Sequence, residues 1–224
     1  MYATQTEAIE DATYHLEWPD VTRRAKRGFD AVAALALLIL LTPLLLLIAL
    51  AVKLEDGGPV LFRQDRLGRG GDMFRIAKFR SMAVDAEARL RANPDLYIRY
   101  VRNDFKLDLA EDVRITRLGR FLRASSLDEL PQLLNVLLGD MSLVGPRPIV
   151  LAELVQYSQR GAAQAYLSVR PGLTGPWQVG GRSSLGYDDR VQLDLTYVAD
   201  ISIGTDLRIL LRTPIVVLRR DGIY

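Results

Sequence analysis

The side chains best suited to chemistry in this sequence are the adjacent carboxylates Asp128 and Glu129. The pattern Ser126-Leu127-Asp128-Glu129 fits a capping box, which predicts a helix beginning near Ser125 or Ser126. Free amides and the helix dipole favour ionised carboxylates in the first turn of a helix, so we expect a depressed pKa for Asp128. An ionised carboxylate at this position can act as a nucleophile or as a magnesium ligand.

Two stripes of side chains are expected along this helix. Asp128, Gln132 and Asn135 are spaced at i, i+4 and i+7, so they share a polar face that could line a site. The leucines at helical spacing are expected to form a separate, buried stripe, and they are Leu127, Leu130, Leu133, Leu134 and Leu137.

Several arginines surround the two carboxylates in the sequence. They are Arg114, Arg117, Arg120 and Arg123 before the predicted helix, and Arg147 in the loop 139–148 after it. Forked guanidinium groups suit phosphate oxygens. The chain has no Cys and a single His, His15, which excludes thiolate sites, Ser-His-Asp triads and multi-histidine metal centres. These residues fit magnesium-assisted phosphoryl chemistry, and the alternative is ordinary helix capping with the arginines as partners of the carboxylates.

A basic segment precedes this region. Residues 57–82 contain short β-type runs on either side of the glycine-rich stretch 67–72, which predicts a β-hairpin with a glycine turn. Positions 63 to 80 hold six basic residues, including Lys78 and Arg80, against two acidic ones. The excess positive charge would attract phosphates or anionic headgroups, and the alternative is a general electrostatic role.

The loop 170–182 is rich in Gly and Pro and contains Arg170, Trp177 and Arg182. A ring and two cations could hold a nucleotide by stacking and charge, and a structural turn is the alternative. Trp177 is expected either to contact the base or to fill a core.

Two other charged segments predict helices without catalytic residues. Residues 83–113 are broken at Asn93-Pro94, which favours helix, loop and helix with a solvated face. Residues 206–218 are mostly apolar with basic residues interspersed, so we expect a helix that lies at a membrane surface or packs on the core.

The element that must place all these residues at their site of action is an apolar segment near the N-terminus. Residues 31–52 carry no charge, and twenty-two helical residues cover about 30 Å, the thickness of the bilayer hydrocarbon. The segment begins too late and is too long for a cleaved signal peptide. Thr42-Pro43 interrupts it halfway, and the proline predicts a sharp kink because it removes one backbone hydrogen bond.

Basic residues stand on both sides of the apolar segment. They are Arg23, Arg24, Lys26 and Arg27 before it, and Lys53 followed by the arginines of residues 63–80 after it. By the positive-inside rule neither flank is expected to be translocated. The charges therefore favour a helix-break-helix that enters and leaves on the cytoplasmic face, with a kinked single-pass anchor as the alternative.

Length and composition agree with one folded unit. The chain has 224 residues, of which 49% are hydrophobic and 25% charged, and its net charge of +2 argues against a nucleic-acid binder. We expect an α+β fold that is mainly helical, with a small β-hairpin and interfacial amphipathic helices. The predicted divisions are a mobile tail at 1–22, a proline-broken re-entrant membrane helix at 23–56 and a cytoplasmic catalytic domain at 57–224.

The longer motifs of the chain resemble the bacterial sugar transferase family, the monotopic polyprenyl-phosphate phosphoglycosyl transferases. The resemblance covers about residues 23 to 224. The motifs that carry it are Lys26-Arg27-Gly28-Phe29-Asp30, Gly58-Pro59-Val60-Leu61-Phe62-Arg63-Gln64, Lys78-Phe79-Arg80-Ser81-Met82, Ser126-Leu127-Asp128-Glu129-Leu130-Pro131-Gln132, the loop 139–148 ending Gly145-Pro146-Arg147-Pro148, and Arg170-Pro171-Gly172-Leu173-Thr174-Gly175.

The resemblance implies a transfer of sugar-1-phosphate from a UDP-sugar to undecaprenyl phosphate, which releases UMP and primes exopolysaccharide synthesis. It implies that Asp128 is the nucleophile that forms a phosphoglycosyl intermediate, that Glu129 assists proton transfer or metal placement, and that Mg²⁺ is bound by Asp128. It also implies phosphate binding by Arg147, with Arg123 as a second arginine.

The resemblance also implies a location at the cytoplasmic face of the bacterial inner membrane, on a re-entrant helix broken at a proline. Within the family, the chain resembles the galactosyl- or glucosyl-phosphate enzymes. It is expected to be a member that consists of the catalytic core alone. The expected partners are the UDP-sugar, undecaprenyl phosphate and membrane lipids, with a homodimer as an assembly to test.

Two other functions remain as alternatives. One is a membrane-anchored binding protein without enzymatic activity, in which the two carboxylates are dispensable. The other is a magnesium-dependent phosphodiester hydrolase, in which water replaces the lipid as acceptor.

Overall fold

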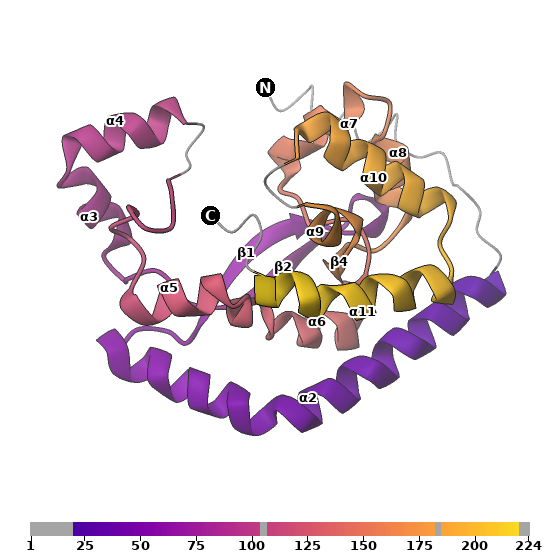
Figure 1. Cartoon of the computed structure of the whole chain (residues 1–224), viewed down its shortest axis with the longest axis horizontal. Helices are drawn as coiled ribbons and strands as arrows, with labels where there is room; N and C mark the ends of the chain where they lie inside the picture. The colour runs from indigo at the N-terminus through magenta and orange to yellow at the C-terminus, as the bar shows by residue number, and fades with distance from the viewer. Residues whose placement is uncertain (1–19, 104–106, 182–184, 220–224) are drawn as a thin grey trace.

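The computed structural model describes residues 20–103, 107–181 and 185–219. Its longest element is α2 (Asp20–Asp56), a helix of 37 residues with Pro43 inside it. Figure 1 shows α2 bent near its middle, with both limbs rising toward the rest of the chain. The hydroxyl of Thr42 donates to the Leu38 carbonyl at 2.6 Å, a contact that commonly accompanies helix bending.

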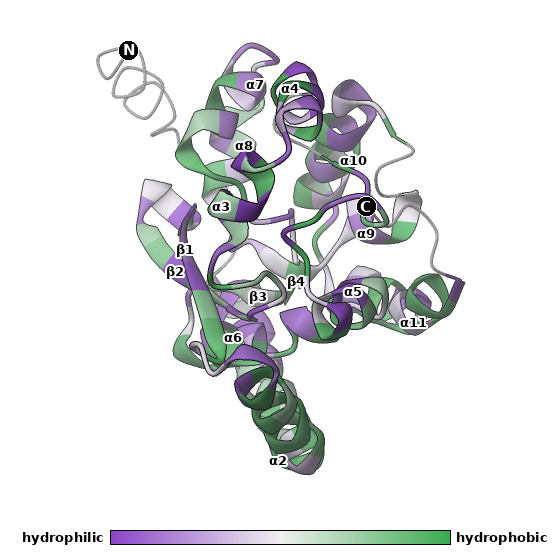
Figure 2. Ribbon diagram, turned by 90° about the vertical axis from the view of Figure 1, so that its left-hand side faces the viewer, coloured by the Kyte–Doolittle hydropathy of each residue, from purple (hydrophilic) through white to green (hydrophobic). Residues whose placement is uncertain are grey.

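The surface of α2 is apolar. Among the described residues it is the one helix long and apolar enough to cross a membrane, and only 11% of its most apolar stretch is buried. Figure 2 shows hydrophobic colour along its length. The large side chains left exposed include Val32, Ile39, Leu40, Leu46, Leu47, Leu50 and Leu54. A core helix of a soluble protein would cover these residues, so the composition and the exposure together agree with a membrane-associated helix.

Both ends of α2 are fixed to the same globular body. Near its start, Lys26 pairs with Asp206, and the carboxylate of Asp30 accepts hydrogen bonds from Ser142. At its end, Asp56 pairs with both terminal nitrogens of Arg80. A straight helix of this length would span about 55 Å, so the attachment of both ends requires the body to extend along the concave side of the bend.

The predicted β-hairpin is present. Strands β1 (Leu61–Leu67) and β2 (Met73–Phe79) are antiparallel, with Leu67 opposite Met73 and Leu61 opposite Phe79. The turn contains a short 3-10 helix, η1 (Arg69–Gly71), in which Gly70 and Gly71 have positive φ angles of 72° and 86°. Glycine adopts this conformation without the steric cost of a side chain, as the glycine-rich stretch predicts.

A second pair of strands was not predicted. β3 (Ser142–Val144) and β4 (Gly172–Thr174) are parallel, with Ser142 beside Gly172 and Val144 beside Thr174. The backbones approach closely, because a Cβ atom on Gly172 would lie 2.1 Å from the Gly145 nitrogen. The glycines of these motifs therefore hold the two chains at a separation that side chains would prevent.

The remaining elements are short helices. Before β3 they are α3 (Ala86–Arg91), α4 (Pro94–Arg102), α5 (Arg117–Ala124), η2 (Leu127–Glu129) and α6 (Gln132–Leu138). After β3 they are η3 (Leu151–Glu153), α7 (Leu154–Ser158), α8 (Ala163–Ser168), α9 (Pro176–Gly180), α10 (Tyr187–Ala199) and α11 (Ile203–Arg219). The helix break expected at Asn93-Pro94 is confirmed, because Asn93 caps α4 by accepting from the Leu96 amide. The mainly helical fold with a small hairpin is likewise confirmed.

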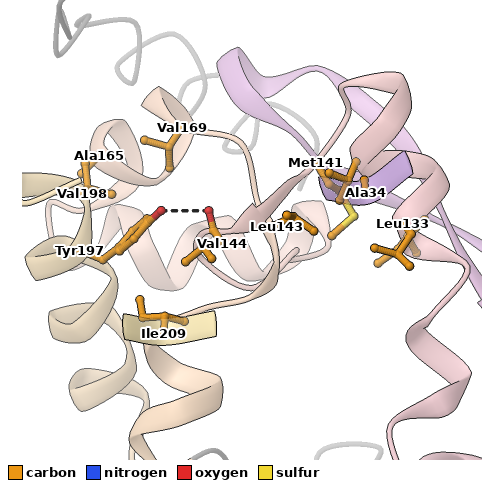
Figure 3. Close-up of a cluster of buried hydrophobic side chains, with 12 residues drawn as sticks. Ala34, Leu133, Met141, Leu143, Val144, Ala165, Val169, Tyr197, Val198 and Ile209 are labelled. Atoms are coloured by element: carbon orange, nitrogen blue, oxygen red, sulfur yellow. Dashed lines mark hydrogen bonds between the residues drawn. The ribbon is translucent and has the colours of Figure 1, made fainter. Parts of the chain in front are cut away.

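The largest core cluster joins β3 to α2, α6, α8, α10 and α11. Figure 3 shows Val144 at its centre, where the Tyr197 hydroxyl donates to the Val144 carbonyl at 2.9 Å. The same hydroxyl lies 2.8 Å from the carboxylate of Asp206, which also holds Lys26 of α2. This network connects the start of the apolar helix to β3 and therefore to the loop that follows it.

Helix α11 has two faces, and the expected packing on the core is confirmed for one of them. Asp206 and Ile209 are buried against the body. The opposite face is an apolar stripe at helical spacing, formed by the exposed residues Ile203, Leu207, Leu211, Ile215 and Leu218. Such a helix fits an amphipathic element lying at a membrane surface.

The helix predicted from Ser125 or Ser126 does not begin there. Ser126 adopts a left-handed conformation with φ 56° and makes no side-chain cap, so the capping box is absent. A 3-10 turn follows, and α6 starts only at Gln132. The expected single leucine stripe is also wrong, because Leu133 is buried whereas Leu134 is 44% exposed.

Asn135 joins α6 to the open edge of β2. Its side-chain oxygen accepts from the Ala77 amide at 3.0 Å, and its nitrogen donates to the Arg75 carbonyl at 2.9 Å. These contacts replace the hydrogen bonds that a neighbouring strand would make. The predicted polar face therefore divides into Asp128, which lies at the site described below, and Asn135, which is structural.

Replacing Asn135 with alanine is expected to lower the free energy of unfolding by about 2–3 kcal/mol, because a buried amide and a carbonyl lose their partners. Denaturant unfolding in detergent micelles measures the change. Gln192→Ala, on the exposed side of α10, is the matched control and should stay within about 0.5 kcal/mol of the parent protein. Equal stability of the two variants would show that Asn135 does not hold the edge of β2.

Candidate active site

Asp128 lies on η2, in the short connection between α5 and α6. It follows Ser126, which among the described residues is the one non-glycine residue with a positive φ angle. A left-handed serine costs on the order of 1 kcal/mol, so the surrounding structure must hold the turn in place. The turn directs Asp128 inward, where its side chain is buried, and leaves Glu129 beside it partly exposed.

The pKa of Asp128 is raised to about 6, chiefly by burial and then by the negative charge of Glu129. The positive charges of Lys78 and Arg123 act in the opposite direction. The depressed pKa expected from a helix dipole is therefore wrong. No regular helix begins at this residue, and the loss of solvent outweighs the neighbouring cations.

Glu129 links the hairpin to the loop after β3. Its carboxylate accepts from the Lys78 ammonium group at 2.7 Å, and a terminal nitrogen of Arg147 lies 3.9 Å from the same oxygen. Lys78 comes from β2 and Arg147 from the loop 139–148, so three separate segments meet at this carboxylate. The structure thus brings together both predicted carboxylates and two of the predicted phosphate-binding cations.

Arg123 completes this side of the site. It comes from the last turn of α5, and its Nε atom donates to the Ser81 hydroxyl at 2.8 Å. Burial lowers its pKa, and the charge of Asp128 raises it. Of the four arginines in residues 114–123, Arg117 and Arg120 are exposed and Arg114 pairs with Asp112, so Arg123 is the member directed toward the site.

The parallel pair of strands presents a second group of side chains. Arg147 and Trp177 each follow the last residue of their strand by three positions, so both lie at the carboxyl end of the pair. The Arg147 guanidinium carbon is 5.2 Å from the centre of the Trp177 ring, and that of Arg190 is 5.4 Å from the same ring. Trp177 is half-buried between two cations, which agrees with a stacking role more than with a core one.

Arg190 and Arg66 are site residues that the sequence analysis missed. Arg190, on α10, is buried among Tyr157, Tyr187 and Trp177, and its Nε and one terminal nitrogen have no acceptor among the described residues. Arg66, on β1, also has a buried Nε without an acceptor among the described residues, and it lies close to the charge of Arg147.

Both missed arginines are tethered through one acidic residue. Glu153 lies 3.8 Å from Arg66 and 3.4 Å from Arg190. Buried guanidinium donors without acceptors indicate an anionic ligand that supplies the acceptors. The position of Arg66 in the basic hairpin was a usable signal, whereas Arg190 lies in no motif.

Two other predicted residues are not brought to this site. Arg80 is directed away, because its guanidinium is held by Asp56 and by the Pro59 carbonyl. Arg170 precedes β4, at the opposite end of the strand from Trp177, and donates to the Gly139 carbonyl at 2.7 Å. Arg182 lies outside the described residues.

The carboxylates fit a magnesium ion only with help from a substrate. Asp128 and Glu129 supply hard oxygen donors, which Mg²⁺ prefers. No group of three or more acidic or histidine side chains that could hold a metal occurs in the described part of the chain. A site of two carboxylates is the type that binds Mg²⁺ together with substrate phosphates and water.

Comparison with known proteins finds sugar-phosphate transferases among the relatives of this chain. The chain is 47% identical over 206 residues to an undecaprenyl-phosphate galactose phosphotransferase of Salmonella typhimurium, which covers 91% of this chain and 42% of that protein. It is 47% identical to the exopolysaccharide production protein ExoY of Rhizobium meliloti, over 88% of each chain. It is also 46% identical to a UDP-glucose:undecaprenyl-phosphate glucose-1-phosphate transferase of Caulobacter vibrioides, over 89% of this chain and 72% of that one.

The chain thus spans less than half the length of the Salmonella protein and most of the length of the Rhizobium protein. The sequence pattern described as bacterial sugar transferase matches residues 21–220, which include α2, the hairpin and every described residue of the site. This chain belongs to the bacterial sugar transferase family.

Proposed function

We propose that this protein transfers sugar-1-phosphate from a UDP-sugar to undecaprenyl phosphate, with galactose or glucose as the sugar. The observation that carries the proposal is the buried carboxylate of Asp128, enclosed by the cations Lys78, Arg123 and Arg147 that surround the dyad. An anionic nucleophile and an anionic substrate can meet only where positive groups offset both charges. The activities of the Salmonella and Caulobacter relatives support undecaprenyl phosphate as the acceptor, and that of the Caulobacter relative supports a UDP-sugar as the donor.

In the first step Asp128 attacks the phosphorus next to the sugar. A bond forms between a carboxylate oxygen and that phosphorus, and the bond from the phosphorus to the bridging oxygen of UMP breaks. UMP leaves with the electron pair of the broken bond. Arg147 lies beside Glu129 and suits the diphosphate oxygens, on which negative charge grows as the bond breaks.

In the second step an oxygen of undecaprenyl phosphate attacks the same phosphorus. The acyl-phosphate bond to Asp128 breaks, the carboxylate is regenerated, and the sugar becomes linked to the lipid through a diphosphate. The Lys78 contact at 2.7 Å holds the Glu129 side chain beside the reacting groups. Glu129 is thus placed to position a metal or to accept a proton from a protonated lipid phosphate.

Asp128 and Glu129 would hold Mg²⁺ together with oxygens of the donor diphosphate. When bound, the ion would offset the negative charge that develops on the leaving phosphate. The chain's own contribution is the positioning of the two carboxylates, through the left-handed turn at Ser126 and the contact of Lys78 with Glu129.

The nucleotide part of the donor is assigned to the carboxyl end of β3 and β4. Trp177 offers a ring between Arg147 and Arg190. The unfilled donors of Arg190 and Arg66 suit the diphosphate or the uracil carbonyls. This assignment places the nucleotide next to Glu129, as the first step requires.

We further propose that α2 re-enters the cytoplasmic leaflet of the bacterial inner membrane. Lys26 and Asp56, near its two ends, are both tied to the same body, whereas a spanning helix would deliver its ends to opposite sides. The exposed stripe on α11 suits the surface of the same leaflet. This geometry holds the site at the interface, where a lipid phosphate and a soluble nucleotide sugar meet.

The test is UMP release by the detergent-solubilised protein with Mg²⁺, UDP-galactose or UDP-glucose, and undecaprenyl phosphate present or absent. The proposal expects turnover with one of the sugars, dependent on the lipid, and recovery of the lipid-linked sugar. Free sugar phosphate formed without lipid would indicate the hydrolase. No UMP from folded protein with either sugar would favour the binding protein without enzymatic activity.

A further inference from the structure

A second group of arginines lies at the turn of the hairpin, apart from the candidate active site. A cavity of about 280 Å³ opens there, and its lining residues are Gly68, Arg69, Asp72, Met73, Phe74, Gly139, Asp140 and Arg170. This space is large enough for several water molecules or a small polar group. None of the steps proposed above uses these residues.

Main-chain carbonyls hold Arg170, which lines the cavity, and Arg27, which lies beside it. Arg170 donates through Nε to Gly139, which leaves its two terminal nitrogens without an acceptor among the described residues. Arg27, from the start of α2, donates to the carbonyls of Val136 and Leu137 at 2.6 and 2.7 Å. These contacts fix the two side chains at the C-terminus of α6, where the helix dipole favours positive charge.

Like charges gather at this point. Burial lowers the pKa of Arg170, and the charges of Arg69, Arg27 and Arg23 lower it further. Arg69 forms no ion pair within the part of the chain that the structure describes, although two carboxylates line the cavity. One of them, Asp140, already accepts from Asn135 at 3.1 Å. Arg69 and the two terminal nitrogens of Arg170 therefore remain as donors for an anion bound in the cavity.

The cavity and the active site lie at opposite ends of the same elements. Met73 of the cavity and Lys78 of the active site are five positions apart on β2, which is about 17 Å of extended chain. Arg170 precedes β4 and Trp177 follows it. A ligand in the cavity would therefore not be the reacting sugar phosphate.

We propose that this cavity binds the phosphate of an anionic bilayer phospholipid, with Arg69 and Arg170 as the side chains that contact it. Membrane lipid is the favoured source, because Arg27 beside the cavity stands one helical turn before the apolar segment that begins at Ala31. Its role would be to orient the body on the bilayer at the start of α2, as Arg80 and Asp56 orient it at the other end. The proposal rests on the insertion of α2 in the membrane, not on the reaction at Asp128.

The experiment uses the whole protein in a neutral detergent and three probes. They are dioctanoylphosphatidylglycerol, dioctanoylglycerol, which lacks the phosphate, and inorganic phosphate, which lacks the lipid. Native mass spectrometry gives the affinity, and hydrogen exchange shows which amides become protected. We expect saturable binding of the phosphatidylglycerol, with slower exchange at residues 68–74, and weak or no binding of the other two probes.

Arg69→Gln should weaken binding of the phosphatidylglycerol about tenfold, since one charge-assisted contact is lost. Arg75→Gln is the matched control, because it removes the same charge from an exposed position of the same hairpin and should leave the affinity unchanged. Asp128→Asn should also bind normally, which separates this site from the proposed reaction. Equal affinities for the Arg69 and Arg75 variants, or equally tight binding of inorganic phosphate, would overturn the proposal.

Discussion

Replacing Asp128 with asparagine is expected to lower the rate of UMP release by about 10⁴-fold or more, because the amide cannot form the acyl-phosphate bond. Losses of this size follow removal of a covalent nucleophile in other enzymes. The substitution keeps the shape of a buried side chain, so a loss of packing does not explain the effect. Single-turnover UMP release with labelled donor measures the rate. Sugar phosphate label that stays on the denatured parent protein reports the covalent intermediate.

Stability should move in the opposite direction to activity. Burial raises the pKa of Asp128 to about 6, above the ordinary value of 3.8, so the folded state favours the protonated form. The stability that this residue contributes is therefore lost as the pH rises from about 4 to about 6, and an asparagine avoids the cost of the buried charge at higher pH. The melting temperature of Asp128→Asn at pH 7.5 should equal or exceed that of the parent protein.

Asp112→Asn is the control for this experiment. Asp112 is also a buried carboxylate, but it pairs with Arg114 at 2.8 Å outside the dyad. Its replacement should lower stability, because Arg114 loses its partner, and leave most of the UMP release. A folded Asp128→Asn protein that releases UMP at the parent rate would exclude Asp128 as the nucleophile.

The hairpin shows what local sequence determines. Apolar β-type runs around consecutive glycines predicted both strands, and the turn at Gly70 and Gly71 has the positive φ angles that glycine permits. Asn93-Pro94 likewise marked a helix start through its own side chain. In each case the residues that set the conformation lie within four positions of one another. The local sequence pattern is therefore sufficient to predict the turn or the helix start.

The dyad shows where local reasoning fails. The Ser-x-x-Glu spacing is that of a capping box, yet Ser126 is left-handed and α6 begins at Gln132. The pKa of Asp128 depends on burial by segments far away in the sequence, and a dipole argument from the first helical turn gave the wrong direction. Lys78 and Arg80 look equivalent in the sequence, but one meets Glu129 and the other Asp56. The choice of partner is a property of the tertiary fold.

Arg190 is the residue of the site that no motif marked. It lies on the buried side of α10, a helix whose sequence resembles that of any solvated helix with a polar start. Its importance comes from three rings that surround it and from the donors it leaves unfilled. A buried arginine of this kind is costly unless a ligand completes its hydrogen bonds.

Replacing Arg190 with glutamine is therefore expected to raise KM for the UDP-sugar about 100-fold, with a smaller change in kcat. Two charge-assisted contacts of about 1.5 kcal/mol each correspond to this factor. Binding of UDP measured by calorimetry should weaken by a similar factor. Arg190→Lys should recover little of the loss, because an ammonium group cannot reproduce the fork of a guanidinium.

The matched control for Arg190 is Arg160→Gln. Arg160 also stacks on Tyr187, with its guanidinium carbon 5.2 Å from the ring centre, but it pairs with the exposed Asp188 and makes no contact with Trp177. KM should not change in this variant. If Arg190 serves only to hold α10 against η3 through Glu153, its replacement should lower the melting temperature and leave UDP binding intact in the protein that remains folded. If Arg190→Gln loses UDP binding while its melting temperature equals that of Arg160→Gln, the loss is not one of stability. The unfilled donors of Arg190 would then be assigned to the nucleotide.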